Sequence, residues 1–318
     1  MRISLLEPLG VSDEMIQKLA EPLKQAGHTF TYYPTKTKDV EELKRRSQGQ
    51  DVVMIANNPY PDEVVEACGE LKMLAVAFTG IDHVGLDACK KQHVMVSNCA
   101  GYSEVSVSEQ VIGMTISLLR KFPVCDETVR NGGTNAGLAG TEISGKTVGI
   151  IGPGHIGFMT ARLFQAFGAN VIAYARHEDP AVKAAGIAYV SLETLLKSSD
   201  IISLHTPNNA STRGLIGKAR IALMKPTAVF INCARGPIVD NQALADALNE
   251  GRIAAAGIDV YDMEPPLPDD YPLLHARHTL LTPHVAFLTK EAMVRRAHIE
   301  FDNVLAYVNG KPQNVCKL

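Results

Sequence analysis

The segment that most constrains the fold is a glycine-rich loop between a short apolar run and a helical pattern. The run TVGIIG occupies residues 147–152, the loop GPGHIG occupies 152–157, and a periodic apolar pattern follows at once. Gly152 permits a tight turn, Gly154 lets the backbone approach a pyrophosphate, and Gly157 lets the helix pack closely against the strand. The N–H groups at the start of that helix would then bind the phosphates. The segment predicts a dinucleotide site, with a merely tight strand–helix turn as the alternative.

Strand-like and helix-like segments alternate along the whole chain. In the first hundred residues the strand-like runs lie at 2–8, 29–34, 51–57, 71–78 and 94–98, and helical patterns lie near 12–26, 38–48, 61–68 and 84–92. After residue 146 strand-like runs recur at 147–152, 170–175, 200–205, 228–234, 254–261 and 279–285. Strands separated by helices are typical of parallel sheets. We therefore expect two α/β domains, the second with the larger sheet.

Three further segments complete this organisation. An apolar helix is expected at 103–121, with a capping box formed by Ser106 and Glu109 at its start. The glycine-rich stretch 131–140 follows and is expected to be a linker or an interdomain loop. A last helix is expected at 287–309, and the helix-stop pair Asn309-Gly310 ends it.

Length, charge and cysteine spacing exclude several classes of protein. The 318 residues suffice for about two domains. A formal net charge of −3 argues against nucleic acid or an anionic membrane as the main partner. No apolar run approaches the length of a membrane span, and the run before Glu7 is too short for a signal-peptide core. The six cysteines include no CxxC pair, so we expect reduced thiols, no metal site and a cytoplasmic protein.

Three polar residues follow later strand-like runs, where open α/β sheets place their ligands. Arg235 follows FINCA, Glu264 follows GIDVY, and His284 follows LLT. Each alone is a weak signal, because a lone arginine is usually a surface charge and a lone histidine is usually structural. Beside a dinucleotide loop, they together predict an arginine that binds a carboxylate and a carboxylate–histidine acid/base pair.

The ordered set of motifs resembles the D-isomer-specific 2-hydroxyacid dehydrogenase family. It comprises GPGHIG, LHTPNNASTRGLIG (204–217), LMKPTAVFINCARGPIVD (223–240), AAGIDVYDMEPP (255–266) and LLTPHVA (280–286). The resemblance extends to TGIDHVGLDAC (79–89) and NCAGYSEVSVSEQ (98–110). It implies two Rossmann-like or flavodoxin-like parallel-sheet domains. The substrate domain would comprise residues 1–98 plus 287–318, and the dinucleotide-binding Rossmann domain residues 99–286.

The resemblance also implies a role for each matching residue. Arg235 would hold the substrate carboxylate, Glu264 would orient His284, and His284 would be the general acid/base of a 2-keto acid reductase. The implied cofactor-binding residues are Gly152, Gly154, His155, Ile156, Gly157, Arg176, His177, His205, Thr206, Pro207, Thr212, Cys233, Ala234 and Asp259. The implied substrate-binding residues are Asn57, Phe78, Thr79, Gly80 and Arg235. For Asp259, a purely structural role and a supporting role beside the catalytic residues remain equally open.

The mechanism that this implies needs a hydride at C2 and a proton at the keto oxygen. Arg235 would polarise the carbonyl through charge-assisted hydrogen bonds, and Glu264 would favour the imidazolium form of His284. Backbone N–H groups of the loop at 77–80 would bind the same carboxylate, and closure of the two domains would exclude water.

The substrate is less well defined than the reaction. Members of the family that act on 3-phosphoglycerate tend to carry arginine where this chain has Ala56 and Asn57, which disfavours phosphoglycerate unless another basic residue substitutes. With no tryptophan and only 6% aromatic residues, the chain favours glyoxylate, hydroxypyruvate or pyruvate. The alternatives are a D-3-phosphoglycerate dehydrogenase, a phosphite-type dehydrogenase, and a non-catalytic dinucleotide-sensing scaffold resembling the C-terminal-binding-protein corepressors.

Cofactor choice and assembly complete the expectations. NAD-preferring domains of this kind place Asp or Glu at the end of the second strand. Here the strand NVIAYA is followed by Arg176 and His177, so we expect NADP to be preferred over NAD, unless Glu178 or Asp179 folds back to the ribose.

The family also implies a homodimer through 103–121 and 131–140, against the alternative of a single buried interdomain helix.

Overall fold

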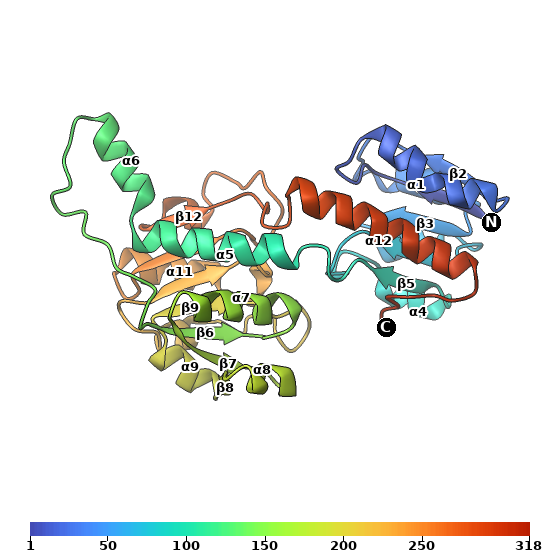
Figure 1. Cartoon of the computed structure of the whole chain (residues 1–318). Coiled ribbons are helices and arrows are strands. Elements are labelled where there is room, and N and C mark those ends of the chain that lie inside the picture. The colour runs from blue at the N-terminus through green and yellow to red at the C-terminus, as the bar shows by residue number, and fades with distance from the viewer. The chain divides into compact units, whose positions relative to one another are not determined.

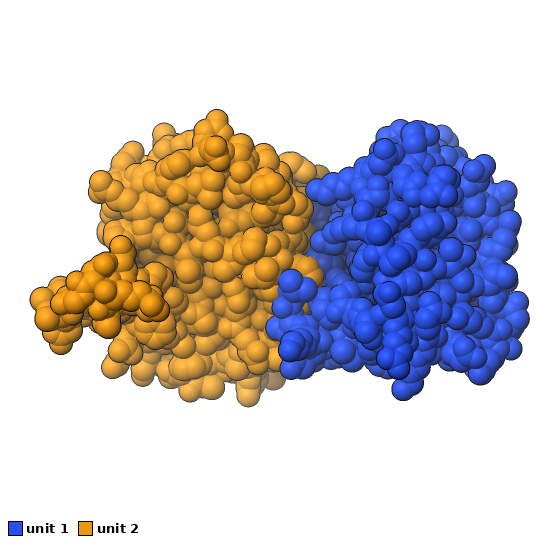
Figure 2. Space-filling view, turned by 90° about the horizontal axis from the view of Figure 1, so that it is seen from above, with its two compact units in different colours: residues 1–103, 288–318 blue, residues 104–287 orange.

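The computed structural model describes all 318 residues and divides into two compact units (Figure 2). Unit 1 comprises Met1–Ser103 and Leu288–Leu318, and unit 2 comprises Glu104–Phe287. The expected boundaries at 98/99 and 286/287 fall a few residues before the observed ones. Both ends of the chain therefore contribute to unit 1.

Unit 1 is built on a parallel sheet of five strands in the order β2-β1-β3-β4-β5 (Figure 1). The strands are β1 (Arg2–Leu5), β2 (Thr29–Tyr32), β3 (Val52–Ile55), β4 (Met73–Val76) and β5 (Met95–Asn98). The helices are α1 (Asp13–Gln25), α2 (Val40–Ser47), α3 (Asp62–Glu66), α4 (Leu86–Lys91) and the C-terminal α12 (Lys290–Val308). Every residue of β3 and β4 is buried, as expected of parallel strands that helices cover on both faces.

The C-terminal segment completes unit 1. Helix α12 packs against α1 and β4. Its side chains also hold the residues after β5, because Asn303 Nδ2 donates to the carbonyl oxygen of Asn98 and Arg295 Nε donates to that of Tyr102. Beyond α12, Val315 pairs with Ser97 at the edge strand β5. The last residues thereby cover one edge of the sheet.

Unit 2 is built on a parallel sheet of seven strands in the order β12-β11-β10-β9-β6-β7-β8. The strands are β6 (Thr147–Ile151), β7 (Asn170–Tyr174), β8 (Ala188–Tyr189), β9 (Ile201–Leu204), β10 (Val229–Asn232), β11 (Ala255–Ile258) and β12 (Thr279–Leu281). The α-helices are α5 (Glu104–Leu119), α6 (Phe122–Arg130), α7 (His155–Ala166), α8 (Pro180–Ala184), α9 (Leu192–Ser198), α10 (Lys218–Ile221) and α11 (Asn241–Asn249). Short 3-10 turns lie at Gly236–Ile238 and Pro272–His275. The expected pair of parallel α/β sheets, the second larger, is confirmed.

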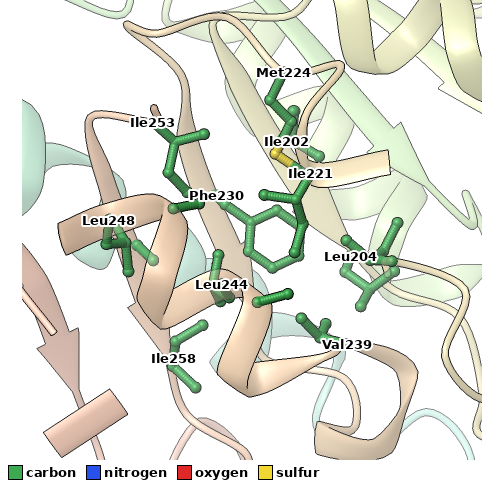
Figure 3. Packing of buried hydrophobic residues seen from close by; sticks show 14 of the residues in the cluster. Ile202, Leu204, Ile221, Met224, Phe230, Val239, Leu244, Leu248, Ile253 and Ile258 are labelled. Atoms are coloured by element: carbon green, nitrogen blue, oxygen red, sulfur yellow. The ribbon is translucent and has the colours of Figure 1, made fainter. Parts of the chain in front are cut away.

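The apolar side chains of β9, β10 and β11 form much of one core of unit 2 (Figure 3). Phe230 lies at its centre, with Ile202 and Leu204 from β9 and Leu244 from α11 around it. All four are fully buried. This packing fixes the strands whose carboxyl ends carry the predicted catalytic residues.

Two local predictions in this region were wrong. The capping box does not form, because α5 begins at Glu104 and Ser106 therefore lies inside its first turn. The stretch 131–140 is not a linker between domains, since it lies within unit 2 and the chain crosses between units at 103/104 and 287/288. Six elements, α6, β8, α8, α9, α10 and α11, were not anticipated from the sequence. None of the helices combines the length and apolar character needed to span a bilayer.

Candidate active site

The glycine loop has the geometry that its sequence predicted. Gly152 adopts a φ of +90°, which side-chain-bearing residues rarely adopt. A Cβ at Gly157 would collide with the carbonyl oxygen of Gly152, whereas a Cβ at Gly154 would meet no atom within 4 Å. The first and third glycines therefore serve the turn and the packing, and the second leaves open space before α7, which begins at His155. This is the arrangement that a pyrophosphate needs.

The loop after β9 adds polar groups beside the glycine loop. A Cβ at Gly152 would lie 2.7 Å from Thr206 Cγ2, so the two loops are neighbours. Thr206 Oγ1 and Asn208 Oδ1 are buried and have no hydrogen-bond partner. Thr212 fixes this loop, because its Oγ1 donates to the carbonyl oxygen of Pro207 at 2.6 Å. Buried polar atoms left without partners fit a dinucleotide that would supply them.

The residues after β7 are those predicted to bind the ribose of the cofactor. Arg176 Nη1 donates to Ser211 Oγ at 3.0 Å, and His177 is exposed. Glu178 forms an ion pair with Lys183. Asp179 caps α8 by accepting a hydrogen bond from the backbone nitrogen of Ala181. Glu178 and Asp179, the two acids that were the alternative ribose-binding residues, therefore each contact another group of the chain.

Two other histidines of the predicted cofactor region have different surroundings. The His205 ring hydrogen-bonds Ser203 Oγ through Nε2 at 2.8 Å, and burial lowers the pKa of His205 to about 4. Burial therefore favours the neutral imidazole, which does not suit a general acid. His155 Nδ1 lies 3.4 Å from Glu104 Oε1 on the surface of unit 2. Cys233, which follows β10, contacts Met114 through its sulfur, at 3.7 Å.

Glu264 and His284 form the predicted pair. His284 Nδ1 lies 2.8 Å from Glu264 Oε1 and 3.0 Å from Oε2. Because a carboxylate only accepts hydrogen bonds, Nδ1 carries the hydrogen of this contact. The Phe287 ring stands edge-on to the imidazole, with ring centroids 5.3 Å apart. His284 itself adopts a φ of +56°, so its backbone is held in the left-handed region.

Asp259 at the end of β11 holds the backbone around His284. Its fully buried carboxylate accepts hydrogen bonds from Thr282 Oγ1 at 2.5 Å and from the backbone nitrogens of Val285 and Ala286 at 2.9 Å each. The backbone nitrogen of His284 donates to the carbonyl oxygen of Asp259 at 2.8 Å. Burial raises the pKa of Asp259, and these donors oppose that shift. Sequence reasoning left its role open, because the contact spans 23 to 27 residues.

Arg235 follows β10 on a loop that a buried asparagine fixes. Asn232 Nδ2 donates to the carbonyl oxygen of Arg235, and Asn232 Oδ1 accepts from the backbone nitrogen of Ala234, each at 3.0 Å. Arg235 Nη1 donates to the carbonyl oxygen of Ala234 at 2.8 Å. A Cβ at Gly236 would collide with the backbone of Tyr261, so the residue after Arg235 must be glycine. Asn232 was missed from the sequence, although a polar residue at a buried strand end was the available signal.

The predicted substrate-binding residues follow β3 and β4 in unit 1. Asn57 Oδ1 accepts a hydrogen bond from Lys36 Nζ at 2.7 Å. Phe78 is buried, and the carbonyl oxygen of Thr79 accepts from Asn98 Nδ2 at 2.8 Å. Gly80 is next in sequence and partly exposed. These residues lie at the carboxyl edge of the unit 1 sheet, as Arg235, Glu264 and His284 lie at that of the unit 2 sheet.

Fold and site together define a nicotinamide-dependent oxidoreductase, and comparison with known proteins gives the family. Residues 112–286 match the family model described as D-isomer specific 2-hydroxyacid dehydrogenase, NAD binding domain. A hydroxypyruvate reductase of Blautia hydrogenotrophica is 34% identical over 300 residues, which cover 92% of this chain and 93% of that protein. A D-3-phosphoglycerate dehydrogenase of Archaeoglobus fulgidus is 36% identical, but only 52% of its length is covered, against 86% of this chain.

A solved structure agrees with these relatives. An acyclic imino acid reductase (Bsp5), solved in complex with NADPH and D-Arg, superposes with a TM-score of 0.90 at 31% identity and full coverage of both chains. The chain belongs to the D-isomer-specific 2-hydroxyacid dehydrogenase family. It is an NAD(P)-dependent oxidoreductase that acts on the CH–OH group of its donors. The family membership that the sequence motifs indicated is therefore confirmed.

Proposed function

We propose that the protein reduces a small 2-keto acid, such as glyoxylate or hydroxypyruvate, to the D-2-hydroxy acid, and catalyses the reverse oxidation. The observation that carries this proposal is the two-oxygen contact of Glu264 with His284 Nδ1, at the strand end next to that of Arg235. Similarity to the hydroxypyruvate reductase of Blautia hydrogenotrophica supports the substrate class.

In the reduction, the reduced nicotinamide supplies a hydride to C2 when it is bound. His284 Nε2 gives a proton to the keto oxygen, so the C=O bond becomes C–OH and the charges balance. Glu264 stabilises the imidazolium that exists before this transfer. Arg235 binds the carboxylate and polarises the keto group.

The test is a panel of small 2-keto acids assayed with NADPH and with NADH. His284→Asn should lower turnover by about two to four orders of magnitude, the scale expected for a lost general acid, while cofactor affinity stays close to that of the wild type. Retention of near-wild-type turnover would reassign the proton donor. Absence of reduction with every member of the panel would refute the function itself.

Reduction of a C=N bond is the second candidate, because the acyclic imino acid reductase superposes over the whole chain. His284 would then protonate nitrogen. The same panel supplemented with a primary amine separates the two. Amine-dependent consumption of NADPH, with none in its absence, would favour imine reduction.

NADPH is the proposed cofactor. Arg176 lies beside Ser211 at 3.0 Å, and the two acids that would select against a 2′-phosphate are engaged with Lys183 and with the start of α8. Gly152, Gly154 and Gly157 would hold the pyrophosphate, and the unsatisfied Thr206 and Asn208 lie beside them. Arg176→Ala should raise KM for NADPH by about 10-fold or more and change that for NADH much less. A wild-type kcat/KM higher with NADH would contradict this choice.

A homodimer in the cytoplasm is the proposed state. No residue of α6 is buried, and Phe122, Val124 and Val129 are 51%, 49% and 73% exposed on an arm that projects from unit 2 (Figure 1). Apolar groups gathered on a projecting element favour burial against a second copy. All six cysteines are free thiols, which suits a reducing compartment. A species of 34.3 kDa in sedimentation at micromolar concentration would contradict the dimer.

A further inference from the structure

Glu264 lies on an irregular segment that no helix or strand holds in place. Residues 262–266 follow β11 without forming a regular element, and the Glu264 side chain is 55% exposed. A carboxylate on such a segment would lose much conformational freedom in any single position. Both of its oxygens nevertheless contact His284 Nδ1. Some other contact must therefore restrict the backbone near Glu264.

Asp262, two residues before Glu264, makes such a contact. Its Oδ2 accepts a hydrogen bond from Asn241 Nδ2 at 2.9 Å and another from the Tyr271 hydroxyl at 3.0 Å. Both donor residues are buried, with exposed fractions of 4% for Asn241 and 6% for Tyr271. Hydrogen bonds to a charged acceptor are stronger than those between neutral groups, so two of them hold this carboxylate firmly.

The two donors are themselves held by other elements of unit 2. Asn241 is the first residue of α11. The Tyr271 ring stands edge-on to the Tyr261 ring, with ring centroids 5.8 Å apart. The hydroxyl of Tyr261 in turn donates to the carbonyl oxygen of Thr282 at 3.0 Å, two residues before His284. The network thus joins the segment after β11 both to α11 and to the end of β12.

The backbone at Asp262 is held as well. A Cβ at Gly236 would lie 1.9 Å from the carbonyl oxygen of Tyr261 and 2.6 Å from the backbone nitrogen of Asp262, so this peptide rests directly on the loop after β10. The same backbone nitrogen lies 3.4 Å from the Tyr271 hydroxyl oxygen. A shift of Asp262 would therefore disturb the loop that carries Arg235 as well as its own segment.

We propose that Asp262 is a positioning residue that keeps the Glu264 carboxylate on His284 Nδ1. The hydroxyl of Tyr271 and the amide of Asn241 hold Asp262 in place for that task. This inference rests on the proposed 2-keto acid reductase activity, in which His284 donates the proton. Asp262 acts through Glu264 on the orientation of the imidazole, because a hydrogen bond at one ring nitrogen sets which nitrogen carries the hydrogen.

Tyr271→Phe is the first test, because it keeps the ring and deletes the hydroxyl. With hydroxypyruvate and NADPH, kcat should fall by about 10-fold, whereas KM for the keto acid and the dissociation constant for NADPH should change by less than about 2-fold. Tyr32→Phe is the matched control, since it deletes a hydroxyl that donates to Asp13 at the same distance of 3.0 Å in unit 1. The kcat of this control should equal that of the wild type.

Two substitutions of Asp262 test the acceptor. Asp262→Asn keeps one oxygen that can accept from Tyr271 or Asn241, whereas Asp262→Ala removes both contacts. The kcat should fall by about 3-fold in Asp262→Asn and by about 30-fold in Asp262→Ala. Thermal unfolding of each variant shows whether the fold is retained, and Asp262→Asn carries the test if Asp262→Ala does not fold.

The tautomer of His284 is the property that a merely structural role would leave unchanged. In ¹⁵N-histidine-labelled protein without cofactor or substrate, the ring ¹⁵N chemical shifts at about pH 9 report which nitrogen of a neutral histidine carries the hydrogen. The signals of His284 are those that disappear in His284→Asn. Nδ1 should carry the hydrogen in the wild type, and Glu264→Ala should give the mixture of a free imidazole. Tyr271→Phe and Asp262→Ala should lie between the two.

The outcomes separate this inference from the proposed function. If kcat and tautomer keep their wild-type values in Tyr271→Phe and Asp262→Ala, the positioning role is overturned and the reductase stands. A fall in kcat without a change of tautomer, or with an equally large rise in the dissociation constant for NADPH, also overturns it, because Asp262 would then act by another route. If the wild type reduces no keto acid, the proposed function fails, and the tautomer, which needs no turnover, still decides whether Asp262 positions Glu264.

Discussion

Glu7 in unit 1 and Asp259 in unit 2 do the same structural task at the carboxyl edges of two different sheets. Each is a buried acid that follows a parallel strand, and each accepts hydrogen bonds from two backbone nitrogens of a neighbouring loop. Burial raises the pKa of both carboxyl groups above their ordinary values. The loops that they hold carry Asn57 and His284.

The two acids differ in the side chain that approaches the carboxylate in addition to the backbone nitrogens. Asp259 receives the neutral hydroxyl of Thr282, whereas Glu7 faces the ammonium of Lys36. A hydroxyl donor completes a fixed loop and adds no charge, which suits a histidine that must exchange a proton. The same device, a buried acid that fixes a loop through two backbone nitrogens, therefore occurs in both units with a different neighbouring group.

Among the substitutions that test this comparison, Asp259→Asn should have the largest effect. The amide nitrogen would face backbone N–H groups that now donate to an oxygen, so the His284 loop should shift and kcat should fall by about 100-fold. The dissociation constant for NADPH, measured by direct titration, separates a role of Asp259 through His284 from a direct contact with the cofactor. An unchanged dissociation constant supports a role through His284, and a rise as large as the fall in kcat would instead make Asp259 a cofactor contact.

Removing the hydroxyl from the same network should have a smaller effect. Thr282→Val keeps the shape of the side chain but deletes the donor to Asp259 Oδ1, at a cost of about 1–3 kcal/mol for the buried acceptor. The free energy of unfolding should fall accordingly, and kcat should fall about 3- to 10-fold. Thr279→Val, in which a hydrogen bond to the carbonyl oxygen of Ala276 is lost from the same strand, is the control and should leave kcat unchanged.

Glu7→Gln tests the unit 1 counterpart. The amide keeps an acceptor for Ala56 and Asn58 but loses the charge that faces Lys36. KM for the keto acid should change about 3-fold while kcat stays near the wild-type value. A fall in kcat as large as that of Asp259→Asn would show that Glu7, like Asp259, supports the chemical step.

The smallest effect on activity is expected at Glu300, a third buried acid. Its Oε2 accepts from Cys99 Sγ at 3.3 Å, and Oε1 has no partner. Burial raises the pKa of Glu300 to about 8, with Cys99, Arg296 and Glu7 as the facing groups. The folded protein therefore retains this proton up to about pH 8, whereas the unfolded chain loses it near its ordinary pKa, about 4.3.

Stability from this group should consequently be full in acid and be lost as the pH rises through that interval, at up to about 1.4 kcal/mol per pH unit. Glu300→Gln should flatten the dependence and stabilise the protein at pH 8 and above, measured by denaturant unfolding. The exposed Glu291→Gln on the same helix should preserve the slope. A Glu300→Gln variant with the wild-type slope would mean that the group is ionised in the folded state.

Local pattern and ordered motifs sufficed for the main architecture and for the contact between Glu264 and His284. The strand runs around Phe230 and Val53 are continuous and apolar, and Glu264 and His284 each follow such a run. The capping box failed because Ser106 and Glu109 match a local spacing that says nothing about where the chain leaves unit 1. Asn232 was missed although its partners Ala234 and Arg235 are local, whereas Lys36 was missed for another reason. The partner of Lys36 is 21 residues away, and only the register of neighbouring strands brings them together.

The composition of unit 1 from both chain ends has a consequence for biosynthesis. All of unit 2 is translated before α12, whose residues hold the segment after β5 and whose continuation pairs with the β5 edge. On the ribosome, the first 103 residues must wait, with an uncovered helix face and an open strand edge, while 184 residues of the other unit emerge and fold. Emergence of residues 288–318 is the event that completes the smaller unit, so nascent chains stalled before α12 should be the species that chaperones and proteases encounter.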